Sequence, residues 1–415
     1  MGLLSKIKQY EKVSKYQTTQ LFNSDSERLN GYENFVALTK DDNLVHTKGK
    51  LIPGVIYINQ LESDPARMIT GDVNGEIIQW IRQNSHRVLA KKTGEGTVTY
   101  MELDDNNSNL YAADRSEAKT DGTEGDVFVK LPTFYYRGND DGPNGSSGDN
   151  VEIRFSKTPF EDSVEWDTNI LIGTYEAYND NGKLYSKSEV ESSTDISQAD
   201  FKSYAAARGS GYQLVDWQMH CVLGCLFYAM YGNTNSQAIC GSGTNSCTKI
   251  CGETNSLGMN DTKANTNGNT MSINFWGLEN WWGNKFEYME GIEGRSRNTV
   301  LILSPDPSSG RSFTWDSNSG YGKHYRFGKY LDLSNDVTER GSDSTYYCDS
   351  NYGPGISARV VRRSSHYADT GGGVSYANAG YDSSTAYMNA GSRLAFRGVC
   401  AKAESVEAFK LLPVL

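Results

Sequence analysis

The chain contains no apolar segment of the roughly 20 residues that a bilayer-spanning helix requires. Basic residues are not in excess either, because 40 Lys and Arg stand against 51 Asp and Glu, a net charge of −11. This balance argues against binding through nucleic-acid phosphates. The first residues, MGLLSKIKQYEKVSK, lack the apolar stretch of a secretory signal. We therefore expect no nucleic-acid partner, no membrane insertion, and synthesis in the cytoplasm without a signal peptide.

The usual motifs of catalysis are missing. There is no Gly-x-Ser-x-Gly elbow, no His-Glu-x-x-His and no Gly-rich phosphate loop. The five histidines are widely scattered, which gives little support to a His-based acid–base site. His220 lies in an apolar segment and is better explained as an interior histidine than as a ligand. We predict no enzyme and no cofactor, although a glycosidase-type carboxylate pair among 51 acidic residues stays open.

Seven cysteines are present, an odd number in a chain with no export signal. Cys221 and Cys225 are one helical turn apart, while Cys240, Cys247 and Cys251 fall in a Ser-, Gly- and Asn-rich stretch. Such spacing is a weak zinc signal when no histidine stands in register. We predict reduced thiols and no bound metal.

Tyrosine and glycine are abundant. The sequence holds 26 Tyr, 14 Phe, 7 Trp and 42 Gly, while only 37% of its residues are hydrophobic. This many aromatic residues excludes a disordered chain. Tyr and Gly with few aliphatic residues are typical of a loop-rich recognition surface on a β scaffold.

Two helices and several strands are predicted. In the segment 197–232, Ser197 and Asp216 are N-cap residues and Gly209-Ser210-Gly211 separates the two helices. The second of these helices is apolar on nearly every face, so we expect it to be buried. Residues 126–137 predict one strand that Pro132 places at a sheet edge or bend. Helices together with short strands predict an α+β fold.

The segment 305–398 is rich in Tyr, Ser, Gly and Asn and has few Ile, Val or Leu. So few aliphatic residues do not form a separate core, so this stretch should lie over a core built elsewhere. Antibody loops use the same residue types, because Tyr supplies a large contact area and Ser, Gly and Asn supply hydrogen bonds. The segment is therefore the candidate binding surface.

Two segments resemble a known family. GLENWWGNKFEYMEG (277–291) resembles the aromatic Gly-Asn motif of formylglycine-generating-enzyme-like C-type lectin domains, and GSRLAFRGV (391–399) is similar to their closing strand. Phage fibre proteins and the variable proteins of diversity-generating retroelements share both features. The resemblance covers roughly residues 76–400. It implies a C-type-lectin-like domain with two helices, short antiparallel strands and long loops.

The resemblance also implies a division of the chain. We expect an N-terminal attachment or oligomerisation region at 1–75, the C-type-lectin-like domain at 76–400 and a C-terminal tail at 401–415. Most residues of the two motifs should be scaffold, and the scaffold set is Trp281, Trp282, Gly283, Asn284, Phe286, Arg393 and Phe396. Ligand contacts are expected from side chains that precede or extend toward the closing strand, namely Tyr346, Tyr347, Tyr352, Tyr367, Tyr376, Asn378, Tyr381, Tyr387 and Asn389.

Chemistry known in that family lacks its residues here. The closely spaced cysteine pair that binds copper in formylglycine-generating oxidases is absent, and so are the Glu-Pro-Asn and Gln-Pro-Asp triplets of calcium-dependent lectins. The resemblance therefore implies a virion protein: a phage fibre or receptor-binding subunit that attaches to a host-surface glycan or protein. It also implies a homotrimer that docks on other virion proteins through its N-terminal region. Two alternatives remain, a retroelement-diversified bacterial ligand-binding protein and a purely structural virion decoration or fibre-docking protein.

Overall fold

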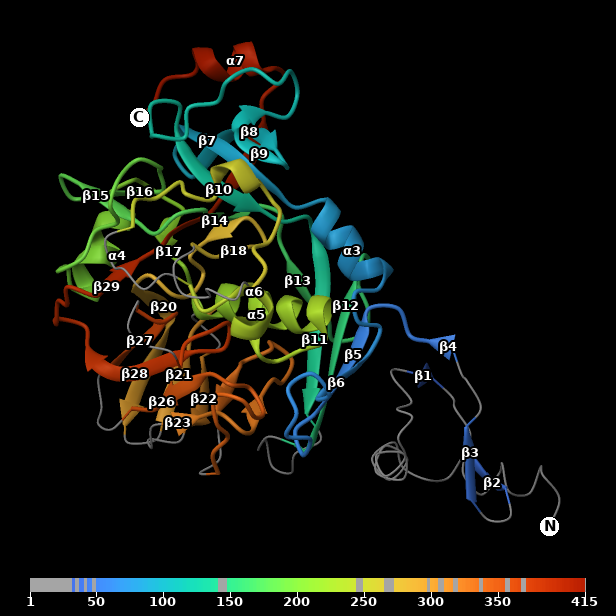
Figure 1. Cartoon of the computed structure of the whole chain (residues 1–415). Coiled ribbons are helices and arrows are strands. Elements are labelled where there is room, and N and C mark those ends of the chain that lie inside the picture. The colour runs from blue at the N-terminus through green and yellow to red at the C-terminus, as the bar shows by residue number, and fades with distance from the viewer. Residues whose placement is uncertain are drawn as a thin grey trace.

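The computed structural model describes residues 50–140, 148–243, 249–264, 272–296, 299–304, 310–315, 320–335, 339–354, 359–366 and 371–414. It also describes three short strand segments nearer the N-terminus, at 32–33, 37–40 and 43–46. Three sheets form the body of the molecule, and five smaller two-stranded ribbons accompany them. Figure 1 shows the body and the strands near the N-terminus, which lie to one side of it.

The first sheet has eight strands and occupies the end of the molecule where the C-terminus lies (Figure 1). Its order is β17-β30-β14-β10-β7-β8-β31, and β9 pairs with β8. The bounds are β17 (Tyr212–Leu214), β30 (Leu394–Arg397), β14 (Ile170–Gly173), β10 (Asp126–Lys130), β7 (His86–Gly94), β8 (Thr97–Asp104), β31 (Val399–Lys402) and β9 (Asn107–Tyr111). Strands far apart in the chain are neighbours here, since β30 lies between β14 and β17.

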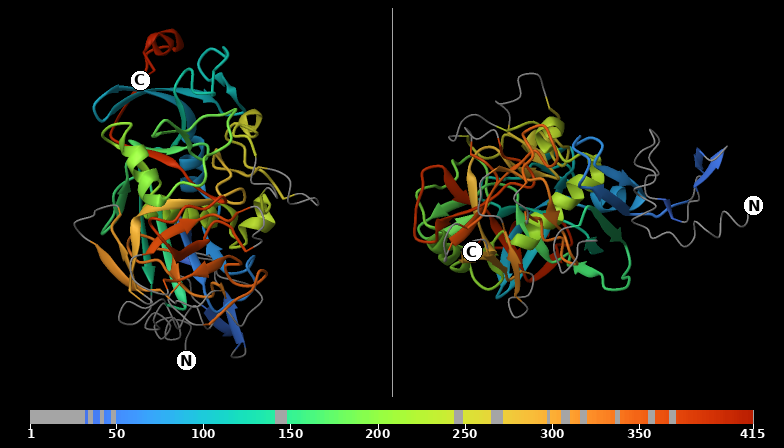
Figure 2. Two further views of the ribbon diagram at one scale, coloured as in Figure 1. Left: turned by 90° about the vertical axis from the view of Figure 1, so that its left-hand side faces the viewer. Right: turned by 90° about the horizontal axis from the view of Figure 1, so that it is seen from below.

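The second sheet also has eight strands and lies at the opposite end, as both figures show (Figures 1 and 2). Its order is β22-β21-β20-β27-β28-β26-β23, and β29 pairs in parallel with β20. The bounds are β22 (Arg311–Thr314), β21 (Thr299–Ile302), β20 (Phe286–Ser296), β27 (Arg359–Arg363), β28 (Ala377–Asp382), β26 (Ser350–Tyr352), β23 (Gly320–Tyr321) and β29 (Ala390–Ser392). The chain therefore crosses from the second sheet to the first between β29 and β30, at Arg393.

The third sheet has five strands in the order β13-β11-β12-β5-β6. The bounds are β13 (Val164–Trp166), β11 (Phe134–Asp140), β12 (Asn150–Ser156), β5 (Val55–Asn59) and β6 (Ile69–Gly71). The predicted single strand over 126–137 is wrong, because Pro132 separates β10 in the first sheet from β11 in the third. The ribbons are β1 (Tyr32–Glu33) with β4 (Lys50–Leu51), β2 (Ala37–Lys40) with β3 (Asn43–His46), β15 (Tyr178–Asp180) with β16 (Lys183–Tyr185), β18 (Asn274–Phe275) with β19 (Leu278–Glu279), and β24 (Tyr325–Arg326) with β25 (Ser334–Asn335).

The described residues include five α-helices, α3 (Glu76–Gln83), α4 (Gln198–Ala206), α5 (Trp217–Tyr231), α6 (Ser236–Cys240) and α7 (Val406–Leu411), and the 3-10 turn η2 (Asn255–Leu257). The predicted caps are confirmed, because Ser197 accepts from the Asp200 amide and Asp216 from the Met219 amide. Nearly every residue of α5 is buried, as predicted, and Figure 1 shows this helix in the middle of the molecule. Gly232 ends α5 in the left-handed conformation, with φ 61°.

The predicted α+β class is wrong, and the fold is mainly β. The segment 305–398, predicted to lie over a core built elsewhere, supplies six strands of the second sheet instead, namely β22, β23, β26, β27, β28 and β29. Aromatic and arginine side chains replace the missing aliphatic ones there. Phe286, Tyr288 and Tyr376 share a buried cluster with Phe128 and Leu171 of the first sheet.

Both predicted domain boundaries cut through packed structure. Ile56 and Ile58, on β5, belong to the same buried core as Ile153 on β12, so residues 55–71 are part of the body and not of a separate N-terminal region. The predicted tail is docked as well. Phe409 of α7 is buried, and the ammonium group of Lys91 donates to the carbonyl oxygens of residues 409, 410 and 412. Burial of their apolar side chains explains why these flanks join the body.

Candidate recognition surface

Arg362, on β27, lies within a group of aromatic rings. The centre of its guanidinium is 3.5 Å from the ring centroid of Tyr381, 4.2 Å from that of Phe286, 5.5 Å from that of Tyr387 and 6.0 Å from that of Tyr288. Each distance is within the range of cation–π attraction. We call these five residues the Arg362 cage. Its arginine is 1% exposed.

Three neighbouring strands of the second sheet build the cage. Tyr288 on β20 pairs directly with Arg362 on β27, and β27 pairs with β28, which carries Tyr381. Successive strands therefore bring these side chains to one face of the sheet. Tyr387 follows on the loop after β28 and meets Tyr381 edge to face, with ring centroids 4.8 Å apart.

The two outer rings of the cage face solvent in part. Tyr381 and Tyr387 are half-buried, whereas Phe286 and Tyr288 are buried. Met388, next in the chain, is 72% exposed. A half-exposed tyrosine offers both an apolar face and a hydroxyl, and such rings stack well on sugars and on protein side chains. Tyr381 and Tyr387 are therefore the residues of the cage that a ligand can contact.

A second aromatic layer supports the cage from below. Tyr376 stacks on Phe286, with ring centroids 5.7 Å apart, and Tyr352 lies 6.0 Å from Tyr376. The amide nitrogen of Asn378 donates to the Tyr376 hydroxyl at 3.2 Å, and its carbonyl oxygen accepts from the Gly380 amide. These contacts hold the first residues of β28 in place beneath the outer rings.

A polar cleft of about 640 Å³ lies beside the cage, between the start of α4, β20 and β27. Its wall includes Val360, whose partner across the sheet is Tyr381, and Ser383 two residues beyond. The charged side chains of the cleft occur in pairs. Lys202 lies 3.6 Å from Glu290, and other pairs join Arg295 with Glu293 and Arg359 with Asp382. Paired charges and backbone groups can hydrogen-bond a ligand rich in hydroxyls.

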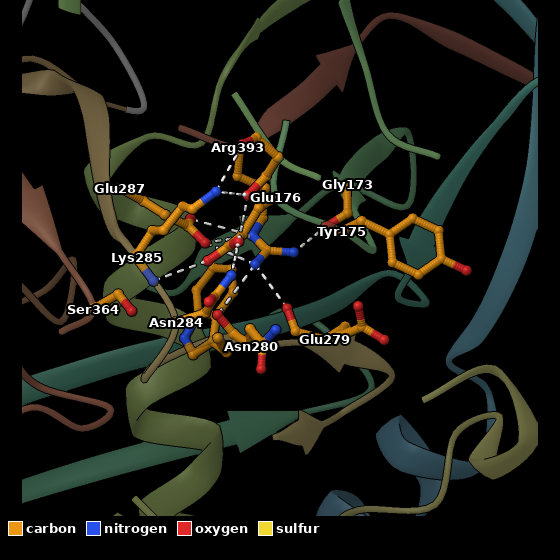
Figure 3. A network of polar contacts seen from close by, with 12 residues as sticks. Gly173, Tyr175, Glu176, Glu279, Asn280, Asn284, Lys285, Glu287, Ser364 and Arg393 are labelled. Carbon is orange, nitrogen blue, oxygen red and sulfur yellow. Dashed lines mark hydrogen bonds and ion pairs between the residues drawn. The ribbon is translucent and has the colours of Figure 1, made fainter. Parts of the chain in front are cut away.

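A buried ionic network fixes the inner end of β20. Arg393 donates to Glu287 at 2.7 Å and also to the carbonyl oxygens of residues 173, 174, 279 and 280. Arg363 forms an ion pair with the same carboxylate and donates to the Trp281 carbonyl oxygen. Figure 3 shows Arg393 with its side chain extended into this group of acceptors. Because Arg393 reaches both sheets, it holds them in a fixed relation.

The network continues through Glu176. Its carboxylate accepts from the Asn284 side chain at 2.6 Å, from the Ser192 hydroxyl at 2.8 Å and from the Lys285 amide at 3.2 Å. Lys285 in turn donates to the Ser192 carbonyl oxygen at 2.7 Å, and Figure 3 shows Asn284 and Lys285 close to Glu176. The Gly-Asn motif is thereby anchored before β20 begins.

Burial shifts the titration of several of these groups. It lowers the pKa of Arg363 to about 9, although Glu287 opposes the shift, and it raises the pKa of Glu176. It also raises the pKa of Tyr288 to about 12, against the opposing charge of Arg362. Burial lowers the pKa of His220 to about 3, and the charge of Arg363 adds to that shift. His220 was predicted as an interior histidine, and it is buried without hydrogen-bond partners among the described residues.

The structure places the predicted ligand-contact residues in several different parts of the molecule. Tyr381 and Tyr387 belong to the cage, Tyr352, Tyr376 and Asn378 lie beneath it, and the carbonyl oxygen of Asn389 accepts from the Phe286 amide. The prediction of a ligand contact is wrong for Tyr347 and Tyr376, because both are at most 1% exposed and offer no contact area. Tyr347 packs instead on Tyr325 and Tyr228 in another core. Tyr346 packs against that core too, and Tyr367 lies outside the described residues.

The seven predicted scaffold residues are all buried. Gly283 has φ 112°, a value that favours glycine, whereas Asn284 is absent from the left-handed region. Arg393 is completely buried, because Glu287 and four carbonyl oxygens replace its hydration.

Sequence reasoning missed Arg362, Tyr288 and the cleft. The available signal was the two-residue spacing of Val360 and Arg362 in RVVRR (359–363), which places both side chains on one face of a strand. The aromatic partners of Arg362 come from positions about 20 and 75 residues away, and single-sequence patterns do not reveal such pairings.

The described residues include no group of three or more His, Cys, Asp or Glu side chains placed to hold a metal ion. The six described cysteines are free thiols, and Cys247 lies outside the described residues. Burial raises the pKa of Cys221 and of Cys251. In that part of the chain, no helix combines the length and apolar character that crossing a membrane requires.

Comparison with known proteins gives no family. No family model matches the chain, and no curated protein matches it. Among solved structures it is similar to one titled "Major Tropism Determinant U1 Variant", with 9% identity and a TM-score of 0.28, over 76% of this chain and 73% of that one. A likeness at that TM-score carries no argument about function.

Proposed function

We propose that this protein is an attachment protein that binds a host cell-surface glycan or protein through the Arg362 cage and the adjoining cleft. The observation that carries the proposal is the pair Tyr381 and Tyr387, half-exposed aromatic rings held edge to face over a buried guanidinium. Rings fixed in this way lose little conformational freedom when a ligand binds.

Recognition in this proposal involves no catalytic step. The two rings supply stacking area, and the paired charges of the cleft supply hydrogen bonds for hydroxyl groups. The buried ionic network supports the cage from within, so the surface is preorganised before the ligand arrives. A receptor-binding role needs only this fixed and partly exposed surface.

The proposal also includes the virus particle that would carry the protein. We place the protein in a virion, as a phage fibre or receptor-binding subunit that forms a homotrimer and docks through its N-terminal region. Three copies on one particle would raise a weak single-site affinity through avidity. Light scattering on the purified full chain tests the trimer, and a mass of three chains is expected.

Attachment of labelled protein to intact candidate host cells tests the function, with and without periodate oxidation of surface sugars. Saturable binding that oxidation abolishes supports a glycan receptor, and binding that survives oxidation supports a protein receptor. Absence of binding to every host would contradict the proposal. In that case the exposed rings would instead be an assembly surface of a structural particle protein.

A further inference from the structure

Arg362 differs from the other completely buried arginines. Arg87 donates to the Gly277 carbonyl oxygen and to four other oxygens, and Arg363 and Arg393 share the carboxylate of Glu287. Among the residues that the structure describes, no carboxylate forms an ion pair with Arg362, and its Nε and Nη2 atoms have no hydrogen-bond partner. Arg363 also lies over a ring, that of Trp281, but it has the Glu287 carboxylate besides, whereas the neighbours of Arg362 are aromatic rings and the hydroxyl of Tyr288.

This environment leaves a buried charge only partly compensated. Ring faces attract a guanidinium, but they accept hydrogen bonds poorly, so two nitrogen donors of Arg362 remain unused. A buried cation without an anion is costly unless a partner is supplied. The cover over Arg362 is Tyr381 and Tyr387, the half-exposed rings of the cage, so a partner would arrive from solvent on that side.

We infer that Arg362 binds an anionic group of the ligand, a carboxylate or a sulfate ester carried by an acidic polysaccharide. The inference rests on the proposed function and specifies its ligand class. A planar guanidinium presents two parallel N–H groups to either anion, and a charge-assisted pair of this kind is strong and directional. The anion would meet the edge of the guanidinium from the solvent side, while Tyr381 and Tyr387 keep their places and stack on the sugar ring.

The surroundings of the cage favour Arg362, and not the neighbouring cations, as the residue that binds the anion. They also favour a saccharide as the ligand that carries this anion, and not a peptide. Lys202, Arg295 and Arg359 in the cleft already have carboxylate partners, so an incoming anion would compete with those carboxylates for them. The net charge of −11 opposes non-specific attraction of a polyanion, so any binding requires a local site. Ring faces beside a polar cleft match the alternating apolar and hydroxyl surfaces of a saccharide.

Immobilised polymers in matched pairs test the inference with the purified full chain in about 0.15 M salt. One pair is polygalacturonate and its methyl ester, the other is dextran sulfate and dextran, and polyglutamate serves as an acidic peptide. We expect binding to at least one charged polysaccharide that is tenfold or more tighter than binding to its neutral counterpart. The pair that responds distinguishes a carboxylate from a sulfate.

Substitutions assign the effect to the residue. Arg362→Gln should weaken binding to the charged polymer at least tenfold. The control Arg67→Gln removes an arginine that pairs with Glu62 outside the cage and the cleft, and it should change binding less than threefold. If Arg362→Gln fails to fold by circular dichroism, Arg362→Lys replaces it. Lysine keeps the charge and loses the planar fork, so a loss of several fold is still expected.

Three results would overturn the inference: equal binding to the members of both pairs or to neither, unchanged binding by the folded Arg362 variant, and binding to polyglutamate alone. Each is distinct from failure of the proposed function, which is loss of all attachment to host cells. Attachment that persists in Arg362→Gln would retain the function and reject the anionic ligand.

Discussion

Arg393 and Glu287 form a completely buried ion pair between the two large sheets, with the Nη2 and Oε1 atoms 2.7 Å apart. Glu287 lies on β20 of the second sheet, and Arg393 is the residue at which the chain passes from that sheet to the first. The same carboxylate also pairs with Arg363. One acidic side chain therefore compensates two buried guanidinium groups below the recognition surface.

Glu287→Gln should destabilise the protein strongly. The substitution leaves Arg363 and Arg393 buried without a negative partner, and breaking a buried pair in this way costs about 3–5 kcal/mol. Glu102→Gln is the matched control, because Glu102 pairs with the half-exposed Lys402 and an exposed pair contributes less than about 1 kcal/mol. Denaturant unfolding measures both values. Equal losses for the two variants would mean that the buried pair does not hold the sheets together.

His220 should make stability depend on pH. Its pKa is about 3 in the folded protein, below its ordinary value of 6.5, so the unfolded chain binds the proton more readily. Stability is therefore fully present above pH 6.5 and is lost as the pH falls toward 3. From pH 7 to pH 5 this single site should remove about 2 kcal/mol.

His220→Leu isolates that contribution. Carboxyl groups with raised pKa, such as Glu176, change stability in the opposite sense, but they titrate alike in both proteins. The difference between wild type and variant across pH 5–7 therefore reports the histidine alone. Identical pH profiles for the two proteins would show that His220 is not held neutral by burial.

Tyr376→Ala should lower the free energy of unfolding. Because Tyr376 is buried, this substitution removes no direct contact with a ligand. Tyr376 is 1% exposed and stacks on Phe286, and truncating a buried aromatic side chain costs about 3–5 kcal/mol. Its loss also removes the acceptor of the Asn378 side chain. Tyr376→Phe, which keeps the ring, should retain most of the stability. A Tyr376→Ala protein as stable as wild type would contradict the burial of this ring.

Part of this structure could be predicted from the sequence. The caps Ser197 and Asp216 and the buried helix between Asp216 and Gly232 follow from local patterns, because side-chain capping and apolar periodicity act within a few residues. The resemblance also directed attention to Tyr381 and Tyr387, which lie on the surface together. Composition predicted an aromatic recognition surface, but it did not show which tyrosines are exposed and which are buried.

The rest depends on contacts between distant parts of the chain. Tyr376 and Tyr381 lie in the same Tyr-, Ser-, Gly- and Asn-rich segment, so composition does not distinguish them. Tyr376 is buried because Phe286 and Tyr352 of β26 cover it, whereas Tyr381 lies beside an exposed loop. The mainly β architecture was missed for the same reason. Strands such as β27 are short and rich in arginine, and only their partners on β20 and β28 make them strands.

The double variant Tyr381→Ala/Tyr387→Ala tests the recognition surface most directly. Its control is Tyr178→Ala/Tyr185→Ala, two half-buried tyrosines that pair across another β-ribbon beside the cation Lys187. Aromatic hot-spot residues contribute about 2 kcal/mol or more to binding, so removal of both rings at the cage should weaken attachment to host cells at least about 30-fold.

The decisive measurement is the apparent dissociation constant of each folded double variant on the host cells that wild type binds. We expect a loss of attachment for Tyr381→Ala/Tyr387→Ala and near wild-type attachment for Tyr178→Ala/Tyr185→Ala. Undiminished attachment by the folded cage variant would contradict the assignment of this surface to recognition.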